Sequence, residues 1–367
     1  MNAGSSDFTL SATPDSPASA PAPADPRDGE LRPLGLSFTG TGSEYFRIWI
    51  VNVLLSIVTF GIYSAWAKVR TLHYFYRNTR LDGASFDYHG KPSAILKGRA
   101  IVVALAFAFQ IATNVSPFLS LAMLVALLAV FPLLLVRSLR FRMANSSYRG
   151  LRFAFAGRDA EAYKVFVLWP LAAVFTIGLL GPLAHQRFKR YQHNHTRFGT
   201  APFAFNAGAG DFYGVYLRAF GMMAAVVAIA GAGSFVLGAT ASGKLGTALS
   251  FGIGIAGFYL ALLAVSPYLM ARLQNIVWSQ TTLAPHAFRS EIKAGRMVFI
   301  FLTNLIAIVL TLGLYLPFAR VRAARYRLEC VTMLAAGPLD SFVAGEAEQV
   351  GALGDAAVDW YDIDIAL

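Results

Sequence analysis

The fold of this chain is decided by residues 59–90, which read TFGIYSAWAKVRTLHYFYRNTRLDGASFDYHG. This basic and aromatic segment ends an apolar run that is long enough to cross a hydrocarbon core of about 30 Å. Weaker copies of the same arrangement recur at the ends of later apolar segments. We therefore interpret the stretch as the place where a membrane helix meets the surface of the bilayer.

The composition is that of a membrane protein. Of the 367 residues, 56% are hydrophobic and only 14% are charged, and the mean hydropathy is +0.54. A soluble domain would carry more charge on its surface. The net charge of +11 gathers at the ends of apolar segments, which favours contact with the lipid bilayer and its anionic headgroups and not with nucleic acid. The single cysteine, Cys330, excludes an intramolecular disulfide.

Seven apolar segments are candidate spans, at residues 48–67, 99–116, 118–136, 165–184, 219–241, 247–271 and 297–319. Short polar links join the second segment to the third and the fifth to the sixth, so each pair is predicted to form a helical hairpin. The predicted fold class is an all-α polytopic membrane protein. We expect about seven transmembrane helices in internally repeated units (3+3+1), with short β-strand and turn elements between the helices at the membrane surface.

Two tails flank the predicted membrane domain, which covers residues 34–333. Residues 1–33 are rich in Ala, Pro, Ser and Asp and are predicted to be a disordered N-terminal tail. Residues 334–367 contain Asp and Glu but no Lys or Arg. We expect an acidic C-terminal tail that is mobile as far as Trp360.

An internal repeat is predicted from an alignment of the segment ends on one arginine. The resulting units lie near residues 36–85, 86–152, 153–202, 203–287 and 288–333. The aligned arginines are Arg70, Arg137, Arg187, Arg272 and Arg322. Four positions later stand Tyr74, Phe141, Tyr191, Ile276 and Tyr326, and eight positions later stand Asn78, Asn145, His195, Gln280 and Cys330. Sixteen positions after the first four arginines stand Phe86, Phe153, Phe203 and Phe288.

These aligned residues are the candidates for an interface or for lipid and anion binding. The set comprises Arg70, Tyr74, Asn78, Arg137, Arg187, Tyr191, Arg272, Arg322 and Tyr326. Arginine and tyrosine one helical turn apart are typical of a membrane interface, where the guanidinium reaches the headgroups. The alternative for the asparagine is a local role in capping a helix or a turn.

Polar residues inside the apolar segments are few. Asn52 and Asn304 each stand 18 positions before an aligned arginine, and Gln110 lies in the second segment. These three are candidates for lining a polar path across the membrane. Hydrogen bonding between helices is the alternative role.

Two topologies follow from this pattern. If all seven segments cross, the second triplet of spans is inverted relative to the first, as in many transporters, and the C-terminus is cytoplasmic. That arrangement places Arg187 and its basic neighbours outside, against the charge rule. In the rival arrangement, the first, fourth and seventh segments are re-entrant and all five basic ends are cytoplasmic. We favour seven spans.

No catalytic or metal-binding motif is present. The chain lacks a P-loop, a dinucleotide fingerprint and an H-E-x-x-H sequence. His185, His193 and His195 lie among cations, which oppose a bound divalent ion. We therefore predict that the protein is not an enzyme and has no cofactor or metal.

Residues 40–98, above all the stretch GTGSEYFRIWIVNVLLSIVTFGIYSAWAKVRTLHYFYRNTRLDGASFDYHG and the later ILKGR, resemble the YjgN-like family of bacterial inner-membrane proteins of unknown function. The resemblance extends from about residue 34 to the acidic C-terminus. It implies a multi-pass protein of the inner membrane and brings no catalytic or binding residues.

Two functions are compatible with the sequence. The first is transport or permeation of a small polar or anionic solute, which the repeated triplets favour. The second is a non-enzymatic membrane scaffold that binds anionic lipid or a partner protein through a basic cytoplasmic face.

Overall fold

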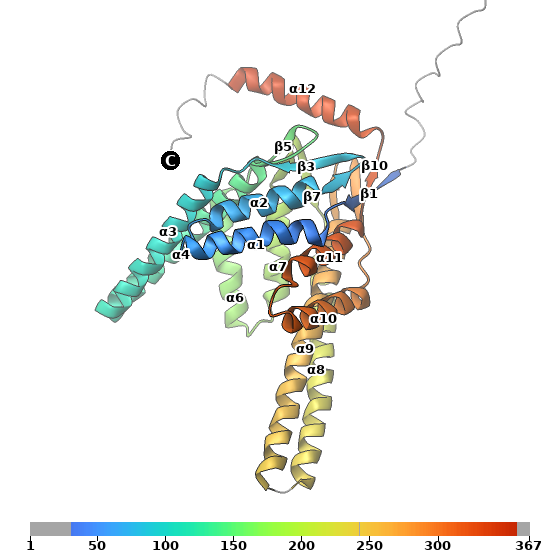
Figure 1. Ribbon diagram of the computed structural model, residues 1–367. Coiled ribbons are helices and arrows are strands. Elements are labelled where there is room, and N and C mark those ends of the chain that lie inside the picture. Colours follow the sequence, from blue (N-terminus) through green and yellow to red (C-terminus); the bar gives the residue numbers. More distant parts are fainter. Residues whose placement is uncertain (1–30, 242, 358–367) are drawn as a thin grey trace, which may run out of the picture. The chain divides into compact units, whose positions relative to one another are not determined.

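The computed structural model describes residues 31–241 and 243–357, in which short β-strands alternate with pairs of helices (Figure 1). The strands are β1 (Arg32–Phe38), β2 (Thr79–Leu81), β3 (Ala84–Tyr88), β4 (Ser146–Tyr148), β5 (Leu151–Phe155), β6 (Thr196–Phe198), β7 (Ala201–Phe205), β8 (Thr281–Leu283), β9 (His286–Ser290) and β10 (Val331–Ala335). The helices are α1 (Gly42–Val58), α2 (Ser64–Arg77), α3 (Pro92–Val115), α4 (Pro117–Ala144), α5 (Asp159–Tyr163), the π-helical η1 (Lys164–Leu168), α6 (Trp169–Phe175), α7 (Gly181–Asn194), α8 (Ala209–Thr240), α9 (Gly243–Ser279), α10 (Ala294–Leu310), α11 (Leu316–Glu329) and α12 (Leu339–Ala357).

The strands form a closed barrel, so the prediction of an all-α fold is wrong. Each strand pairs antiparallel with its neighbour in the chain, and β1 closes the ring against β10 with Arg32 opposite Ala335. Short strands were expected after the helix ends, but as separate surface pieces. Local sequence patterns predict where the strands lie but not how they pair. The pairing is out of reach because the ring is closed by residues about 300 positions apart.

Alternation along the strands fills the barrel with apolar side chains. Leu34, Leu81, Tyr148, Phe198 and Met333 are buried in one cluster inside it. The aligned phenylalanines pack against this cluster, and their rings meet other aromatic rings: Phe86 lies 4.7 Å from Tyr148, Phe153 lies 4.9 Å from Phe198, and Phe203 lies 6.2 Å from Phe288. The barrel axis is therefore a packed core.

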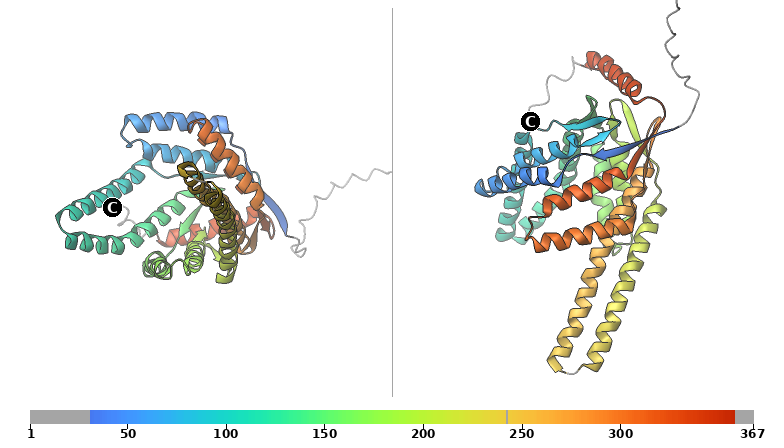
Figure 2. Two further views of the ribbon diagram at one scale, coloured as in Figure 1. Left: turned by 90° about the horizontal axis from the view of Figure 1, so that it is seen from below. Right: turned by 45° about the vertical axis from the view of Figure 1, so that its right-hand side comes forward.

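Every helical hairpin leaves and re-enters the barrel at the same end, which we call the helix end. The pairs are α1–α2, α3–α4, α5/η1/α6–α7, α8–α9 and α10–α11. The short turns between paired strands, such as Asp82–Gly83 and Arg149–Gly150, lie at the opposite end, the turn end. Figure 2 shows the hairpins spreading from the barrel, with α8 and α9 the longest pair.

Two of the hairpins are long and apolar enough to cross a membrane. By length and composition, four helices in the described part of the chain qualify: α3, α4, α8 and α9. The prediction of about seven transmembrane helices is therefore wrong. Segments 48–67, 165–184 and 297–319 are each broken near their middle by a tight turn, which a hydropathy window does not detect.

The three breaks share one pattern, a threonine, a large apolar residue and a glycine, at residues 59–61, 176–178 and 311–313. At the first of them, the Thr59 hydroxyl donates to the Leu55 carbonyl at 2.7 Å and accepts from the Tyr63 amide at 3.0 Å. Phe60 and Gly61 both have positive φ, 48° and 87°. This left-handed pair reverses the chain, and equivalent bonds occur at the other two tips.

The apolar residue at each tip projects fully into the surroundings of the protein. The exposed fractions are 97% for Phe60, 96% for Ile177 and 94% for Leu312. Exposure of a single large apolar side chain is common, whereas here three equivalent ones stand at the ends of apolar hairpins.

The first part of the acidic tail forms α12, which covers the turn end of the barrel (Figure 1). Leu339 and Val343 join the barrel cluster, and the Phe342 ring lies 4.7 Å from His286. Glu346 accepts hydrogen bonds from the Thr200 amide at 2.7 Å and the Ala201 amide at 2.9 Å.

The prediction of a mobile tail is therefore wrong for this helix, because its apolar residues at positions i, i+3 and i+4 complete the barrel core. The predicted disordered tail of residues 1–33 lies outside the described residues, apart from its last three. Of these, Arg32 and Pro33 belong to β1.

The turn at Gly61 provides a test of this architecture. Replacing Gly61 by Ala places a Cβ on a residue with φ +87°, which costs about 1–2 kcal/mol because L-residues are strained in this region. We expect a lower unfolding temperature in detergent. The control is Gly98→Ala inside α3, where a Cβ meets nothing within 4 Å and where Ala is the better helix former by about 1 kcal/mol. Destabilisation of both variants alike would contradict the proposed role of the turn.

Candidate functional site

The second helix of each hairpin leads directly into a strand, and this junction fixes which side chains face the barrel axis. Thr196 at the start of β6 donates its hydroxyl to the carbonyl of Gln192, four residues earlier in α7. Ser146 does the same to Arg142, and Thr281 to Val277. Residues three to four positions apart share a helical face, so the residue four before the strand lies beneath the helix end of the barrel.

Three cations reach this region from three different hairpins. Arg142 of α4 and Arg327 of α11 both stand four residues before a strand, and Lys189 of α7 stands one turn before Gln192. We call Arg142, Lys189 and Arg327 the axial cluster. Burial lowers the pKa of Lys189, and the positive charges of Arg327 and Arg142 lower it further. Burial also lowers the pKa of Arg327.

The axial cluster is held by neutral partners. The Arg327 Nε donates to Gln274 Oε1 at 2.7 Å, and Gln274 Nε2 donates to the Arg327 carbonyl at 2.9 Å. Lys189 Nζ lies 3.5 Å from Gln192 Oε1. Among the described residues, no ion pair includes any of the three cations. Within the part of the chain that the structure describes, the charge of the cluster is therefore not neutralised by a carboxylate.

His185 and His193 of α7 have separate environments. Burial, and then the charge of Lys189, lower the pKa of both His185 and His193 to about 4. Both are therefore neutral at pH 7. His185 Nδ1 lies 2.9 Å from the Tyr216 hydroxyl, whereas His193 Nδ1 lies 3.3 Å from Thr281 Oγ1. Within residues 31–241 and 243–357, no three His, Cys, Asp or Glu side chains are grouped to hold a metal ion.

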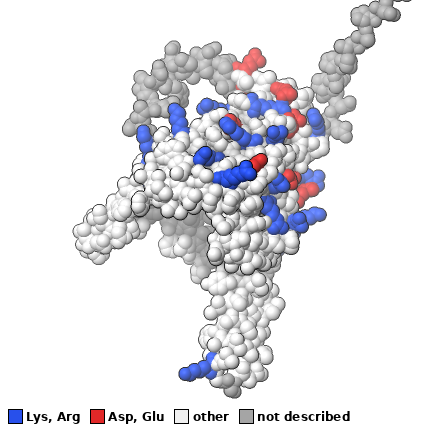
Figure 3. Space-filling model, viewed as in Figure 1, with Lys and Arg blue, Asp and Glu red and all other residues white. Residues whose placement is uncertain are grey.

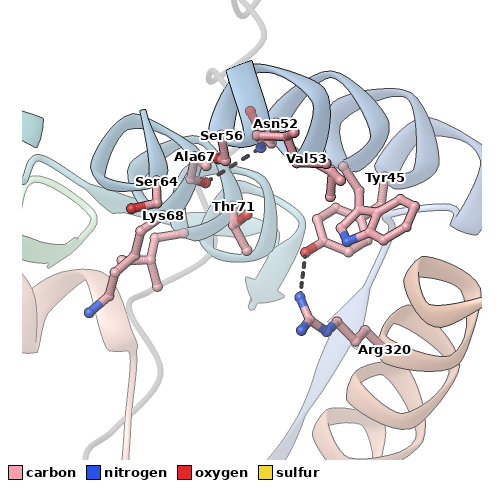
Figure 4. A pocket seen from close by; sticks show the side chains of 12 residues that line it. Tyr45, Asn52, Val53, Ser56, Ser64, Ala67, Lys68, Thr71 and Arg320 are labelled. Carbon is pink, nitrogen blue, oxygen red and sulfur yellow. Dashed lines mark hydrogen bonds between the residues drawn. The ribbon is translucent and has the colours of Figure 1, made fainter. Parts of the chain in front are cut away.

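A groove lies between α1 and α2, beside Arg320 of α11, with a volume of about 490 Å³ (Figure 4). Its polar lining comprises Tyr45, Asn52, Ser56, Ser64, Lys68, Thr71 and Arg320. Arg320 Nη1 donates to the Tyr45 hydroxyl at 3.4 Å. A second groove of about 440 Å³, between α10, α11 and the start of α1, is lined by Arg296, Arg322 and Arg325 among others.

The arginines of the alignment do not converge on one site. Arg70 Nη1 donates to the Tyr63 hydroxyl at 3.0 Å, and the guanidinium of Arg187 lies 5.7 Å from the centre of the Trp169 ring. Arg272 lies over the Tyr268 ring at 5.9 Å, and Arg137 is exposed on α4. Each arginine therefore belongs to its own hairpin.

The aligned tyrosines join the two helices of a hairpin at the barrel. The Tyr74 hydroxyl donates to the Thr41 carbonyl at 2.7 Å, and that of Tyr191 to the Arg158 carbonyl at 3.2 Å. Lys293 donates its amide to the Tyr326 hydroxyl at 3.0 Å. In each case the partner is the N-cap residue of the first helix.

The remaining candidates from the sequence are spread over the hairpins. Asn78 Nδ2 donates to the Tyr74 carbonyl at 2.8 Å and caps α2. Asn52 and Asn304 are buried and donate to the carbonyls of Ala67 and Ala319, in the second helices of their hairpins. Gln110 is exposed on α3. The three candidates for a polar path are thus in separate hairpins.

Sequence reasoning missed the axial cluster as a group. The available signal was the position four residues before an even-numbered strand, which holds Arg142 before β4 and Arg327 before β10. Finding it required knowing that the strands close into a barrel, since only then do these positions face one axis.

Charge is distributed unevenly over the described surface. Figure 3 shows Lys and Arg side chains over the barrel and the adjoining helix ends, whereas the projecting part of the long hairpin is uncharged until a basic side chain near its tip. In the sequence, Lys244 is the one basic residue between Arg218 and Arg272. The fold and this distribution define a membrane protein with a basic barrel domain and apolar hairpins.

Comparison with known proteins gives the family. Residues 33–360 match a family described as "Bacterial protein of unknown function (DUF898)". The chain belongs to this family, because the match covers most of its length.

Three relatives named "Inner membrane protein YjgN" are similar to the chain. The relative from Salmonella typhimurium is 25% identical over 338 residues, which cover 78% of this chain and 85% of the relative. The relative from Escherichia coli O157:H7 is 32% identical over 142 residues, 38% of this chain and 36% of the relative. The relative from Escherichia coli K12 is 36% identical over 124 residues, 32% of this chain and 30% of the relative.

No solved structure shows significant similarity to the chain. The resemblance to the YjgN-like family is confirmed, and the protein is a membrane protein of an uncharacterised family.

The contrast between Arg322 and Arg70 yields a prediction. Arg322 Nη1 donates to Asn304 Oδ1 at 3.1 Å and to Thr303 Oγ1 at 2.9 Å. Arg322→Ala leaves the buried Asn304 oxygen without a donor and is expected to cost about 1–3 kcal/mol. Arg70→Ala removes one exposed hydrogen bond and is expected to change stability by less than about 0.5 kcal/mol. Thermal unfolding in detergent measures both, and equal losses would refute the assignment.

Proposed function

We propose that this protein is a non-enzymatic, multi-pass protein of the bacterial inner membrane that binds anionic lipid headgroups at the helix end of its barrel. The axial cluster is the observation that carries this proposal. Arg142 lies two residues before the end of α4, one of the four helices able to cross a membrane. The cluster is therefore close to the level at which lipid headgroups begin.

Electrostatics favours an anionic ligand at this position. Removing a cation from water is costly unless a counter-charge or hydrogen bonds compensate. Lys189 is partly buried, and the charges of Arg327 and Arg142 act on it. A phosphate group supplies both the missing negative charge and acceptor oxygens for the guanidinium groups.

The proposed orientation has the barrel and the C-terminal helix in the cytoplasm. Both long hairpins start and finish at the helix end, so the barrel lies on one side of the bilayer. Its many Lys and Arg side chains support a cytoplasmic location for that side under the positive-inside rule. The three short hairpins then enter the bilayer part-way, with Phe60, Ile177 and Leu312 in the hydrocarbon. This is the re-entrant arrangement, and it relieves the charge conflict at Arg187.

A lipid-binding scaffold is better supported than transport. A solute moving along the barrel axis would have to displace the phenylalanines of the core and the three α12 residues that pack on them.

We further propose that the five hairpins arose as repeats of one strand–helix–helix–strand unit. In each of them an amide just after the odd-numbered strand donates to the carbonyl of the aligned capping residue at 2.7–3.0 Å, as from Thr39 to Asn78 and from Glu291 to Cys330.

Cysteine labelling tests the orientation. In a Cys330→Ser background, Lys244→Cys at the tip of α8–α9 is expected to react with a membrane-impermeant maleimide in intact spheroplasts. Glu348→Cys on the exposed face of α12 should react only after the membrane is permeabilised. The opposite pattern would overturn the proposed orientation without affecting the fold.

Lipid retention tests the function. Lys189→Gln is expected to lower the amount of phosphatidylglycerol and cardiolipin that copurifies with the protein several-fold, measured by lipid mass spectrometry at 0.1 M salt. The same retention in the native protein should fall at 0.5 M salt, because screening weakens charge contacts. The matched control is Lys244→Gln, at the opposite end of an apolar hairpin.

The unfolding temperature separates binding from misfolding. Lys189→Gln removes one of three neighbouring positive charges and with it their mutual repulsion, so the delipidated variant is expected to be at least as stable as the native protein. Unchanged lipid retention in a folded Lys189→Gln protein would refute the proposed function.

A further inference from the structure

His286, the first residue of β9, is buried at the turn end of the barrel, beneath α12. It is 1% exposed, and the Phe342 ring of α12 lies 4.7 Å from its ring at an interplanar angle of 86°. Its Nδ1 accepts a hydrogen bond from the Ala336 amide at 3.2 Å. Ala336 lies in the short link between β10 and α12. The imidazole therefore contacts both the covering face of α12 and the segment that leads into it.

These contacts fix the protonation state of the imidazole. A backbone amide can only donate, so Nδ1 presents its lone pair to Ala336 and the ring proton is on Nε2. Among the described residues, Nε2 is buried and has no hydrogen-bond partner. A second proton would sit on Nδ1, against the amide hydrogen of Ala336, and would leave a charge in an apolar enclosure. Burial accordingly lowers the pKa of His286.

The surrounding groups do not compensate a charge on His286. The neighbouring strands β8 and β10 carry no ionisable side chain. The ionisable side chains of α9 and the described ones of α12 are Lys244, Arg272, Asp340, Glu346 and Glu348. The first two lie on the α8–α9 hairpin, away from the turn end. Asp340 pairs with Arg149, and Glu346 accepts from the amides of the β6–β7 turn. In the barrel cluster, the Tyr148 hydroxyl donates to the Leu81 carbonyl at 2.7 Å. No ion pair between described residues includes His286.

The attachment of α12 can open without opening the barrel. The strand ring is complete without this helix, since β1 pairs directly with β10. The helix follows β10 after a link of three residues, Ala336 to Pro338. A terminal element held by side chains alone can therefore leave as a unit while the strand ladder stays intact.

We propose that His286 makes the attachment of α12 sensitive to pH, so that the helix covers the turn end while the imidazole is neutral and is released when the imidazole is protonated. The docked state admits only neutral His286, whereas the released state allows it the ordinary histidine pKa of about 6.5. The docked state thus binds fewer protons, and docking weakens as the pH falls below about 6.5. Release uncovers the apolar cluster on which Leu339 and Val343 pack. The device lies at the opposite end of the barrel from the axial cluster and does not depend on lipid binding.

Hydrogen exchange of the full chain in detergent measures the docking equilibrium. The amides of Thr200 and Ala201 donate to Glu346 of α12, so docking protects them. We expect their protection factor, corrected for the intrinsic exchange rate, to be about tenfold lower at pH 5.5 than at pH 7.5. Both values lie above the usual pKa of carboxyl groups, about 4. The strand amides that join β1 to β10 are expected to keep their protection at both values.

Matched variants assign the effect to His286. His286→Asn keeps an acceptor for the Ala336 amide but does not titrate, and His286→Phe replaces the imidazole by an apolar ring. Each is expected to show the same protection at both pH values. The control is Asp340→Asn, which removes the exposed ion pair with Arg149. It is expected to lower the protection by the same small factor at both pH values and to keep the tenfold difference.

Three outcomes would overturn the proposal: equal protection of Thr200 and Ala201 at the two pH values in the native chain, a tenfold difference that persists in His286→Asn or His286→Phe, or an equal loss of protection at the strand amides. The first and third are measured on the native chain and decide against the proposal whether or not the variants fold. None of them affects the retention experiment at Lys189, so the two proposals fail separately.

Discussion

Closure of the ten-stranded ring is the constraint on which the rest of the structure depends. Even-numbered strands such as β2 and β4 have three residues, too few to be stable alone. Each becomes stable because its backbone groups are paired on both sides, and a closed ring leaves no unpaired edge. The last pair, β1 with β10, joins the two ends of the domain. All five helical hairpins must then start and finish at one end of the barrel.

The ring also determines what the helices present to the axis. Strand alternation places Thr196 and Thr281 inside the barrel, and their hydroxyls bond back to the preceding helical turn. This rigid junction transmits the register of the strand to the helix. Arg142, Lys189 and Arg327 come from hairpins far apart in the chain, yet the ring brings them near enough for the charges of Arg327 and Arg142 to lower the pKa of Lys189. Positive charge is thereby concentrated where the apolar hairpins begin.

The five hairpins share one backbone arrangement, but equivalent positions carry different side chains in different hairpins. Asn304 is closed off by Arg322, whereas Asn52 in the equivalent place keeps an unpaired oxygen beside a groove. Arg187, at the position of Arg322, meets Trp169 in place of an asparagine. These exchanges leave the backbone hydrogen bonds at the barrel unchanged.

Parts of this fold could be read from the sequence, and others could not. The apolar runs that became α3, α4, α8 and α9 are long, uninterrupted and bounded by charge, so local hydropathy suffices to find them. The run at 48–67 was misread because its turn, Thr59-Phe60-Gly61, contains a single glycine and a large apolar residue at positive φ. A hydropathy window averages over the residues of such a turn and therefore does not detect that the backbone reverses there. The axial cluster was equally out of reach, because its members are neighbours only across the axis.

By itself, the sequence determined membrane residence, the family, the residues at which helices end and the short strand-forming segments that follow them. These features depend on neighbours within about 20 residues, where composition and spacing carry the physical signal. Only the tertiary structure decided that the strands form one barrel and that α12 covers its turn end. It also decided that the three cations of the axial cluster come together at the opposite end, the helix end. Those outcomes depend on backbone hydrogen bonds and side-chain packing between residues such as Leu34 and Met333, which are far apart in the chain and have no local signature.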